Sequence, residues 1–291
     1  MSRFFLSVLT LVSLLTSASA QESPETLWTI KTGRALKARD EYVVHTTYTD
    51  LRRVVLRDEG GVIMDSAVTF KISFDALVNV ASTTEDGQEK DKYLSVRNCM
   101  IEQNGKQTDL IPTGTKIRAW FSDSGSVYTI EGKPAPDSLQ ALLSMFIRSE
   151  GGTKTSDILD PPAKKNRRKI GDTWPVNTKA LLENLGVPKA LKPKASGKVK
   201  FLAVDSLYKR RGLVVQGIAK VTNRVPAFEN FEQGSMTTEA DITLVVPSDS
   251  RYPTLRAISD IRQTTEAVAK QGASLTLWSE TRVTIDSGFE R

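Results

Sequence analysis

The stretch Met236-Thr-Thr-Glu-Ala-Asp-Ile-Thr-Leu-Val-Val246 decides the fold class of this chain. Its even-numbered residues are mostly apolar, whereas Thr237, Glu239 and Asp241 between them are polar. Successive side chains of a β-strand point to opposite faces, so this period of two predicts a strand with one buried face and one wet face. Such strands are typical of antiparallel sheets, because the strands of parallel sheets are covered on both sides.

The same alternation recurs along most of the chain. A first group of strands is expected near residues 41–49, 51–58, 62–75, 77–83, 92–103, 116–122 and 126–131. A second group is expected near residues 196–206, 212–223, 236–246, 254–267 and 274–286. The polar side of the second group carries charges of both signs, which neighbouring strands could pair across the ladder. The sequence therefore predicts a mainly β protein of the α+β class, with two tall, twisted antiparallel sheets that could form an open half-barrel.

Two short amphipathic helices are expected, one behind each sheet. Apolar residues recur at helical spacing from Leu139 onward and predict a helix over 137–148. A second helix is expected over 178–185, with Thr178 as a suitable N-cap and Gly186 to end it.

The segment between the two helices predicts a domain boundary. Residues 151–169 are rich in Gly, Ser, Pro and consecutive charges, a composition typical of a linker or long loop. We expect an N-terminal β domain over 21–150 and a C-terminal β domain over 170–291.

The first twenty residues predict a secretory signal peptide. Arg3 gives a positive start, residues 4–15 are apolar, and Ala18-Ser19-Ala20 offers a cleavage site. A stable membrane anchor needs roughly 20 apolar residues, so this run is too short. We expect a mature chain that begins at Gln21, works in the periplasm or outside the cell, and is not an integral membrane protein.

The chain has a single cysteine and a single histidine, which restricts its chemistry. Cys99 cannot form an intrachain disulfide, and its place within an expected strand predicts a buried, inert thiol. His45 also lies inside an expected strand, whereas catalytic bases usually lie at strand ends or in loops. One His and one Cys nearly exclude a structural zinc site, and no calcium or phosphate loop is present. We predict no catalytic residue, no metal and no cofactor.

Positive charge is concentrated in residues 164–220, which carry 15 Lys or Arg and 3 Asp or Glu. The candidate anion-binding residues are Lys164, Lys165, Arg167, Arg168, Lys169, Lys209, Arg210 and Arg211; a further group between them is Lys189, Lys192, Lys194, Lys198 and Lys200. Export and the lack of interleaved aromatic residues argue against nucleic acid. Anionic lipid head groups and acidic polysaccharides remain as partners, and a solvated loop is the alternative.

Two further motifs carry a resemblance. Leu110-Ile-Pro-Thr-Gly-Thr115 precedes the first expected helix, and Ile170-Gly-Asp-Thr-Trp-Pro-Val176 follows the linker. This order resembles a group of uncharacterised exported bacterial proteins with an L-x-P-x-G-T element and a V-G-D-x-W element, over about 70 residues. The resemblance implies an extracytoplasmic β-rich protein and no known activity. On physical grounds, Gly171 and Asp172 favour a tight turn, after which Trp174 enters the core.

Three functions are compatible with these features. The leading hypothesis is a non-enzymatic cell-envelope protein, binding or structural, that could hold an apolar or lipid ligand on a curved sheet. One alternative is a protein that binds anionic lipid head groups or acidic polysaccharide. The other is a hydrolase that uses two carboxylates facing each other in a cleft.

Overall fold

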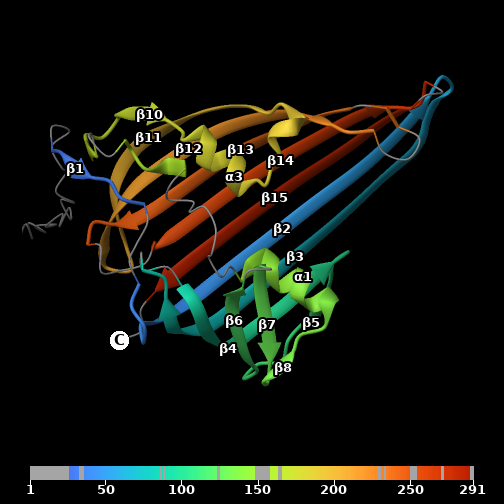
Figure 1. Ribbon diagram of the computed structural model, residues 1–291. Helices are drawn as coiled ribbons and strands as arrows, with labels where there is room; N and C mark the ends of the chain where they lie inside the picture. Colours follow the sequence, from blue (N-terminus) through green and yellow to red (C-terminus); the bar gives the residue numbers. More distant parts are fainter. Residues whose placement is uncertain are drawn as a thin grey trace, which may run out of the picture.

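The computed structural model describes residues 26–32, 36–85, 87, 89–122, 125–147, 158–162, 166–227, 231–232, 234–249, 254–269 and 272–288. The predicted signal peptide lies outside these residues. The main element is an open antiparallel sheet of thirteen strands (Figure 1).

Seven strands of this sheet come from the first half of the chain: β2 (Glu41–Asp58), β3 (Gly61–Thr83), β4 (Glu89–Gln103), β5 (Lys106–Asp109), β6 (Lys116–Ser122), β7 (Gly125–Ile130) and β8 (Lys133–Pro134). Six come from the second half: β10 (Thr173–Pro175), β11 (Lys194–Leu207), β12 (Arg210–Val225), β13 (Gly234–Pro247), β14 (Arg256–Val268) and β15 (Ser274–Gly288). A separate pair joins β1 (Trp28–Thr29) to β9 (Arg167–Arg168). The predicted mainly β class with long antiparallel strands is confirmed.

The arrangement differs from the expectation in one respect, because the two groups of strands share one sheet. Their order is β10-β11-β12-β13-β14-β15-β2-β3-β4-β6-β7-β8, with β5 added to β4. The junction is the antiparallel pairing of β15 with β2, which runs from Ser274 opposite Arg57 to Gly288 opposite Val43. Strand edges meet through backbone groups that every residue carries, so side-chain alternation does not reveal which edges join.

Two predicted strand breaks are also absent. Strand β2 runs unbroken through Asp50, and β3 runs unbroken through Ala76. Both strands are far longer than the usual five or six residues, and together they form the projecting end of the sheet in Figure 1.

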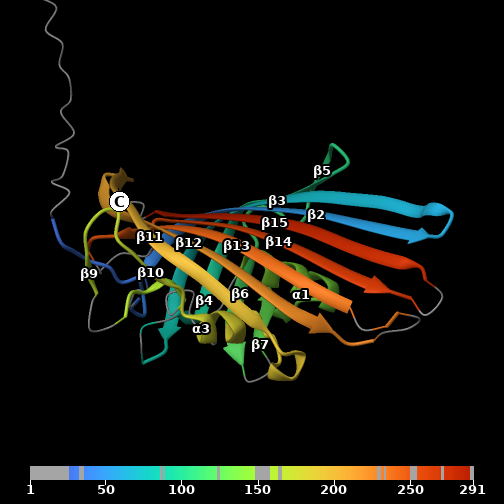
Figure 2. The same cartoon turned by 90° about the horizontal axis from the view of Figure 1, so that it is seen from above.

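Two short helices cover the same face of the sheet (Figure 2). Helices α1 (Asp137–Phe146) and α3 (Thr178–Asn184) match the predicted ones closely, and a 3-10 turn, η2 (Lys189–Leu191), follows α3. The N-cap of α3 is Asn177, one residue before the expected Thr178, and its side chain accepts a hydrogen bond from the Ala180 backbone N–H at 3.2 Å. We call the side that carries both helices the concave face and the other side the convex face.

Each helix covers a hydrophobic core of its own. The first core lies under α1 and includes Tyr48, Ile72, Phe74, Leu143 and Phe146. The second lies under α3 and includes Leu159, Trp174, Leu181, Phe201 and Val215. Gly217 allows the second core to pack tightly, because a Cβ atom there would lie 2.3 Å from the Leu159 side chain. In the described part of the chain, no helix combines the length and apolar character needed to cross a membrane.

Candidate functional site

The convex face of the central strands carries paired charges. Lys220 Nζ lies 2.9 Å from Glu239 Oε1, and this hydrogen bond is the main reason that the pKa of Glu239 is lowered. Two further contacts, Arg262 to Glu280 at 3.6 Å and Arg282 to Asp260 at 3.5 Å, join β14 to β15. This side of the sheet is thus a solvated, charged surface.

The concave face of the same strands is almost uncharged. Register places Leu277 of β15 opposite Thr265 of β14 and opposite Val54 of β2, so these three side chains share one face. Residues of the same parity on β15 include Val283, which packs in the core under α1. That shared core identifies their side as the concave one.

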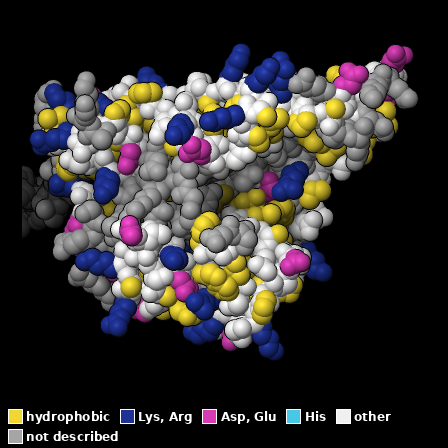
Figure 3. Space-filling view, viewed as in Figure 1, with side chains coloured by type: hydrophobic (Ala, Val, Ile, Leu, Met, Phe, Trp, Pro, Cys, Tyr) yellow, Lys and Arg dark blue, Asp and Glu magenta, His cyan; other side chains and the backbone are white. Residues whose placement is uncertain are grey.

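A band of apolar side chains on this face belongs to neither core. We call it the open strip, and its members are Val54, Met64, Val68, Ile261, Leu275 and Leu277. Met64 and Val68 are exposed, and the other four are partly exposed. Figure 3 shows this side of the molecule hollowed next to the part that carries α1, with apolar atoms gathered along the hollow. The open strip therefore offers an apolar surface that no described element covers.

One charged pair lies at the inner end of the open strip. Asp50 is 1% exposed and accepts a hydrogen bond from Arg52 Nε at 2.7 Å. Its other carboxylate oxygen accepts one from Thr281 Oγ1 at 3.0 Å. Burial, followed by the neighbouring Asp50 charge, raises the pKa of Tyr48. The Arg52 side chain itself is 60% exposed, so it forms a fixed polar point beside an apolar surface.

The sequence does not predict this pair, because the strands expected near 41–49 and 51–58 place Asp50 between two strands. A signal was present: Tyr48, Asp50 and Arg52 have the same parity, so within one strand they share a face.

Only some of the candidate anion-binding residues between 164 and 211 lie close together in the structure. Lys164 and Lys165 lie outside the described residues. The Arg168 guanidinium lies 5.2 Å from the centre of the Trp174 ring, and that of Arg211 lies 5.5 Å from the centre of the Trp28 ring. Because Trp28 is the cross-strand partner of Arg168, these contacts join the first and third basic groups at one end of the molecule.

The other basic residues are placed differently. Arg167 and Lys209 are exposed, whereas Lys169 and Arg210 are partly buried. Lys198 and Lys200 alternate along β11 with the core residue Val199, so they lie on the opposite side of the sheet from it. They therefore do not join the tryptophan-containing end.

The Gly171–Asp172 segment forms a turn that leads Trp174 into the second core. Gly171 has φ +93°, and the Asp172 carboxylate accepts a hydrogen bond from the Lys169 backbone N–H at 3.0 Å. Trp174 is 3% exposed and donates its indole N–H to the Leu159 carbonyl at 2.9 Å. The motif therefore has a structural role: the turn at Gly171 and Asp172 positions Trp174 in the second core.

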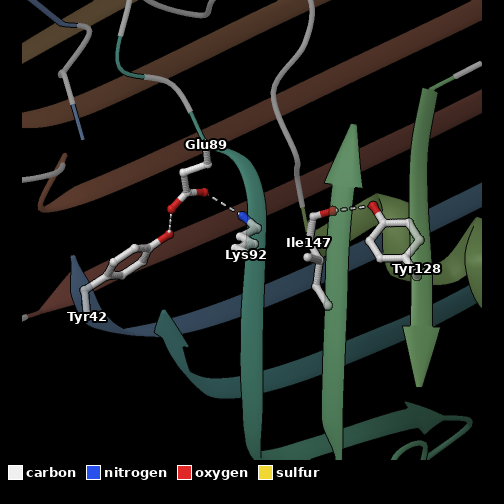
Figure 4. Close-up of polar contacts among 5 residues, drawn as sticks. All are labelled: Tyr42, Glu89, Lys92, Tyr128 and Ile147. Carbon is white, nitrogen blue, oxygen red and sulfur yellow. Dashed lines mark hydrogen bonds and ion pairs between the residues drawn. The ribbon is translucent and has the colours of Figure 1, made fainter. Parts of the chain in front are cut away.

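A buried polar cluster that the sequence analysis missed lies near the start of β4 (Figure 4). The Tyr42 hydroxyl donates to Glu89 Oε1, and Lys92 Nζ lies 2.7 Å from Glu89 Oε2. Figure 4 also shows the Tyr128 hydroxyl, which donates to the Ile147 carbonyl at 2.6 Å. Each of these groups has a partner, so the cluster anchors strands and the end of α1.

The two side chains best suited to nucleophilic or acid–base chemistry, His45 and Cys99, are either paired with another residue or buried. His45 Nδ1 lies 2.6 Å from Asp75 Oδ1 near the surface. Burial raises the pKa of the Cys99 thiol to about 12. Within the described ranges, no three His, Cys, Asp or Glu side chains are grouped so that they could hold a metal ion.

Comparison with known proteins identifies no family. No family model matches the chain, and no curated protein matches its sequence. Among solved structures, a lipovitellin structure titled for lipid–protein interactions gives a TM-score of 0.31 at 11% identity, over 86% of this chain and 26% of that one. This chain thus spans about a quarter of the lipovitellin chain.

Two other solved structures are similar over most of their length. An outer membrane channel from Pseudomonas putida F1 gives a TM-score of 0.22 at 9% identity, over 87% of this chain and 97% of that one. DynF from the dynemicin biosynthesis pathway of Micromonospora chersina gives 0.19 at 7% identity, over 91% of both chains. With every TM-score below 0.5, these likenesses decide neither fold nor function.

Proposed function

We propose that this protein is an exported, non-enzymatic protein of the cell envelope that binds an apolar, lipid-like ligand on its open strip. The observation that carries the proposal is the contrast between the two faces of the central sheet. Charges are paired along the convex face, whereas in the described residues the concave face of β2, β13, β14 and β15 carries only Asp50, Arg52 and, at the turn into β3, Asp58. Folded proteins rarely keep a large apolar surface in water unless something binds there.

The chemistry of the open strip suits an amphiphile. Its apolar members are interleaved with the neutral side chains of Gln263, Thr265 and Ser279. Burying apolar surface stabilises a complex by roughly 25 cal/mol per Å², so a long hydrocarbon chain laid along the strip would bind mainly through this effect. The Asp50–Arg52 pair at one end supplies a polar point for a ligand that has one polar end.

The same face weighs against the hydrolase alternative. Glycoside hydrolysis needs two carboxylates on opposite sides of the scissile bond. In the described parts of β2, β13, β14 and β15, the concave face carries two carboxylates, Asp50 and Asp58. Arg52 and Thr281 occupy the oxygens of Asp50, and Asp58 lies at the far end of β2, where it accepts a hydrogen bond from the Gly60 backbone N–H at 2.8 Å. A binding function therefore fits this surface better.

Native mass spectrometry of the full-length protein, purified from its own host, tests the proposal. We expect a bound species whose mass matches a lipid. In a parallel titration with a fluorescent fatty acid, Leu277→Gln should weaken binding strongly. Thr276→Gln, one residue earlier and on the opposite face, is the matched control and should bind like the unmodified protein. Equal binding by both variants, with no co-purifying lipid, would exclude the open strip as the site.

The anionic-surface alternative has one specific observation in its favour. The indole N–H of Trp28 and the Nε–H of Arg168 are buried and have no hydrogen-bond acceptor among the residues that the structure describes. An anionic oxygen between β1 and β9 could accept from both. Binding to vesicles of anionic lipid that fades as salt is added would support this second function, because salt screens charges beyond about 10 Å at 0.1 M.

Export is tested by sequencing the N-terminus of the protein recovered from the periplasm or medium. We expect Gln21 as the first residue, because Ala18-Ser19-Ala20 precedes it. Recovery of a chain that starts at Met1 would contradict export by cleavage.

A further inference from the structure

The first nine residues of β3, Gly61–Thr69, have a strand on one side only. Their partner is β2, whereas pairing with β4 begins at Phe70, which lies opposite Gln103. All nine residues are exposed. Along this segment, which we call the β3 edge, the outward backbone N–H and C=O groups meet no described strand.

From Met64 to Thr69 the β3 edge lacks the usual protection against pairing; its one irregularity is the register shift against β2 at Ile63, near the turn. The outer strands of the sheet, β8 and β10, are two and three residues long and contain Pro134 and Pro175. Short strands and prolines at an edge discourage the addition of another strand. The β3 edge is long and contains neither proline nor lysine, and its large side chains Val62, Ile63, Met64 and Val68 are exposed.

The one charged residue of the β3 edge does not protect it either. Asp65 is bound by Arg53 of the same molecule, with Nε at 2.8 Å and Nη2 at 2.5 Å from its two carboxylate oxygens. The segment is therefore close to neutral, and two copies of it would not repel each other.

We infer that the β3 edge is a dimerisation site, at which a second copy of this chain adds its own β3 edge in antiparallel orientation. Self-pairing about a two-fold axis through Ser66 places Met64 opposite Val68, where both side chains lie on the concave side. The same register places Asp65 opposite Ala67, so no like charges meet, and the regular pairing ends at the bulged residue Ile63. The surface is thus complementary to itself, as the interface of a two-fold dimer must be.

Such a dimer would also have a geometric consequence. A two-fold axis perpendicular to the sheet keeps the concave faces of both copies on the same side. The open strips of the two copies, which both include Met64 and Val68, would then meet at the junction. The inference rests on the open backbone edge and does not depend on what the open strip binds.

Cysteine cross-linking of the full-length protein tests the site. In Ser66→Cys, residue 66 of each copy would face its counterpart, so mild oxidation should give a disulfide-linked dimer on a non-reducing gel. The matched control is Ser235→Cys, which should remain monomeric. Ser235 is exposed, but β13 is paired with β12 on one side and β14 on the other, so its backbone offers no free edge. The native Cys99 is 2% exposed and should not contribute.

Sedimentation over a wide range of concentration gives a second, independent measurement. We expect the unmodified protein to dimerise, Ser66→Lys to lose the dimer because two lysines would meet at the axis, and Ser235→Lys to keep it. Thermal unfolding of each variant shows whether it is folded. A monomer at every concentration, as expected if the edge binds a strand of a different protein, would overturn the inference. So would a dimer that persists in Ser66→Lys without cross-linking through Ser66→Cys.

Discussion

Arg52 Nε donates a hydrogen bond to Asp50 Oδ2 at 2.7 Å, on the concave side of a strand that contains both residues. Asp50 is buried, and its second oxygen is bound by Thr281, 231 positions further along the chain. A charge in such a place is tolerated only when its hydrogen-bonding capacity is satisfied. The pair and Thr281 therefore link the two halves of the protein at the centre of the sheet.

Removing this carboxylate should destabilise the protein. We expect Asp50→Ala to lower the free energy of unfolding by about 1–3 kcal/mol, because Thr281 and Arg52 lose their acceptor in a buried place. The control is Asp65→Ala, which removes an exposed partner of Arg53 and should cost much less, because water screens an exposed ion pair. Urea denaturation measures both. Equal losses in the two variants would show that burial of Asp50 does not matter.

Trp174 should be among the most costly residues to truncate. Its ring is buried under α3 and its N–H is bonded to Leu159, so Trp174→Ala should cost about 3–5 kcal/mol in unfolding free energy. Trp174→Phe keeps most of the ring and should lose much less. Chemical denaturation decides, and a loss below about 1 kcal/mol for the alanine variant would be incompatible with a core position.

Cys99 should be unreactive in the folded protein and should make stability fall at high pH. With a pKa of about 12, the thiol stays protonated at pH 8, so a thiol reagent should react only after urea unfolds the chain. An unfolded cysteine has a pKa near 8.5, so both states hold the proton below that pH. As pH rises from about 8.5 toward 12, the unfolded chain ionises first and stability is lost.

The matched variant for this test is Cys99→Ser. Its unfolding free energy, measured from pH 8 to 11, should fall less steeply than that of the unmodified protein. Parallel pH profiles, or rapid labelling of Cys99 without urea, would contradict the prediction.

Two adjacent arginines should behave differently. Arg168 contacts the Trp174 ring, and such a cation–π contact is worth about 0.5–2 kcal/mol, so Arg168→Gln should lower the melting temperature. Arg167 is exposed, and Arg167→Gln should leave stability within about 0.5 kcal/mol. Thermal unfolding of both variants measures this difference. If instead both variants unfold like the original protein, the contact between β9 and the second core has no energetic role.

Sequence alternation predicted what depends on side chains facing a core. In β13, Glu239 lies on the convex face and Leu244 in the core under α3, as the pattern of residues 236–246 indicates. The two helices were predicted from their apolar stripes for the same reason. These features depend on burial, and buried positions can be recognised in the sequence because their residues are apolar.

Features that depend on which side chains become neighbours in the folded protein could not be predicted in this way. The strands expected near 41–49 and 51–58 stop on either side of Asp50, a residue type that disfavours strands, yet Thr281 on the neighbouring strand stabilises Asp50 there. The charge-rich segment was visible as composition, but composition could not show that Arg168 and Arg211 would lie over tryptophan rings. The contacts of a cation depend on tertiary structure.

The pairing of β15 with β2 has a consequence for how the chain reaches its native state. Strand β15 is the last described strand and β2 is the first of the large sheet, so their ladder cannot form until almost the whole chain has been synthesised. Contacts between segments so distant in sequence make folding slow. During that delay both β2 and β14 would expose an edge, which favours aggregation. A chain exported as we propose would complete its sheet only after translocation, and a chaperone that shields strand edges should raise its yield.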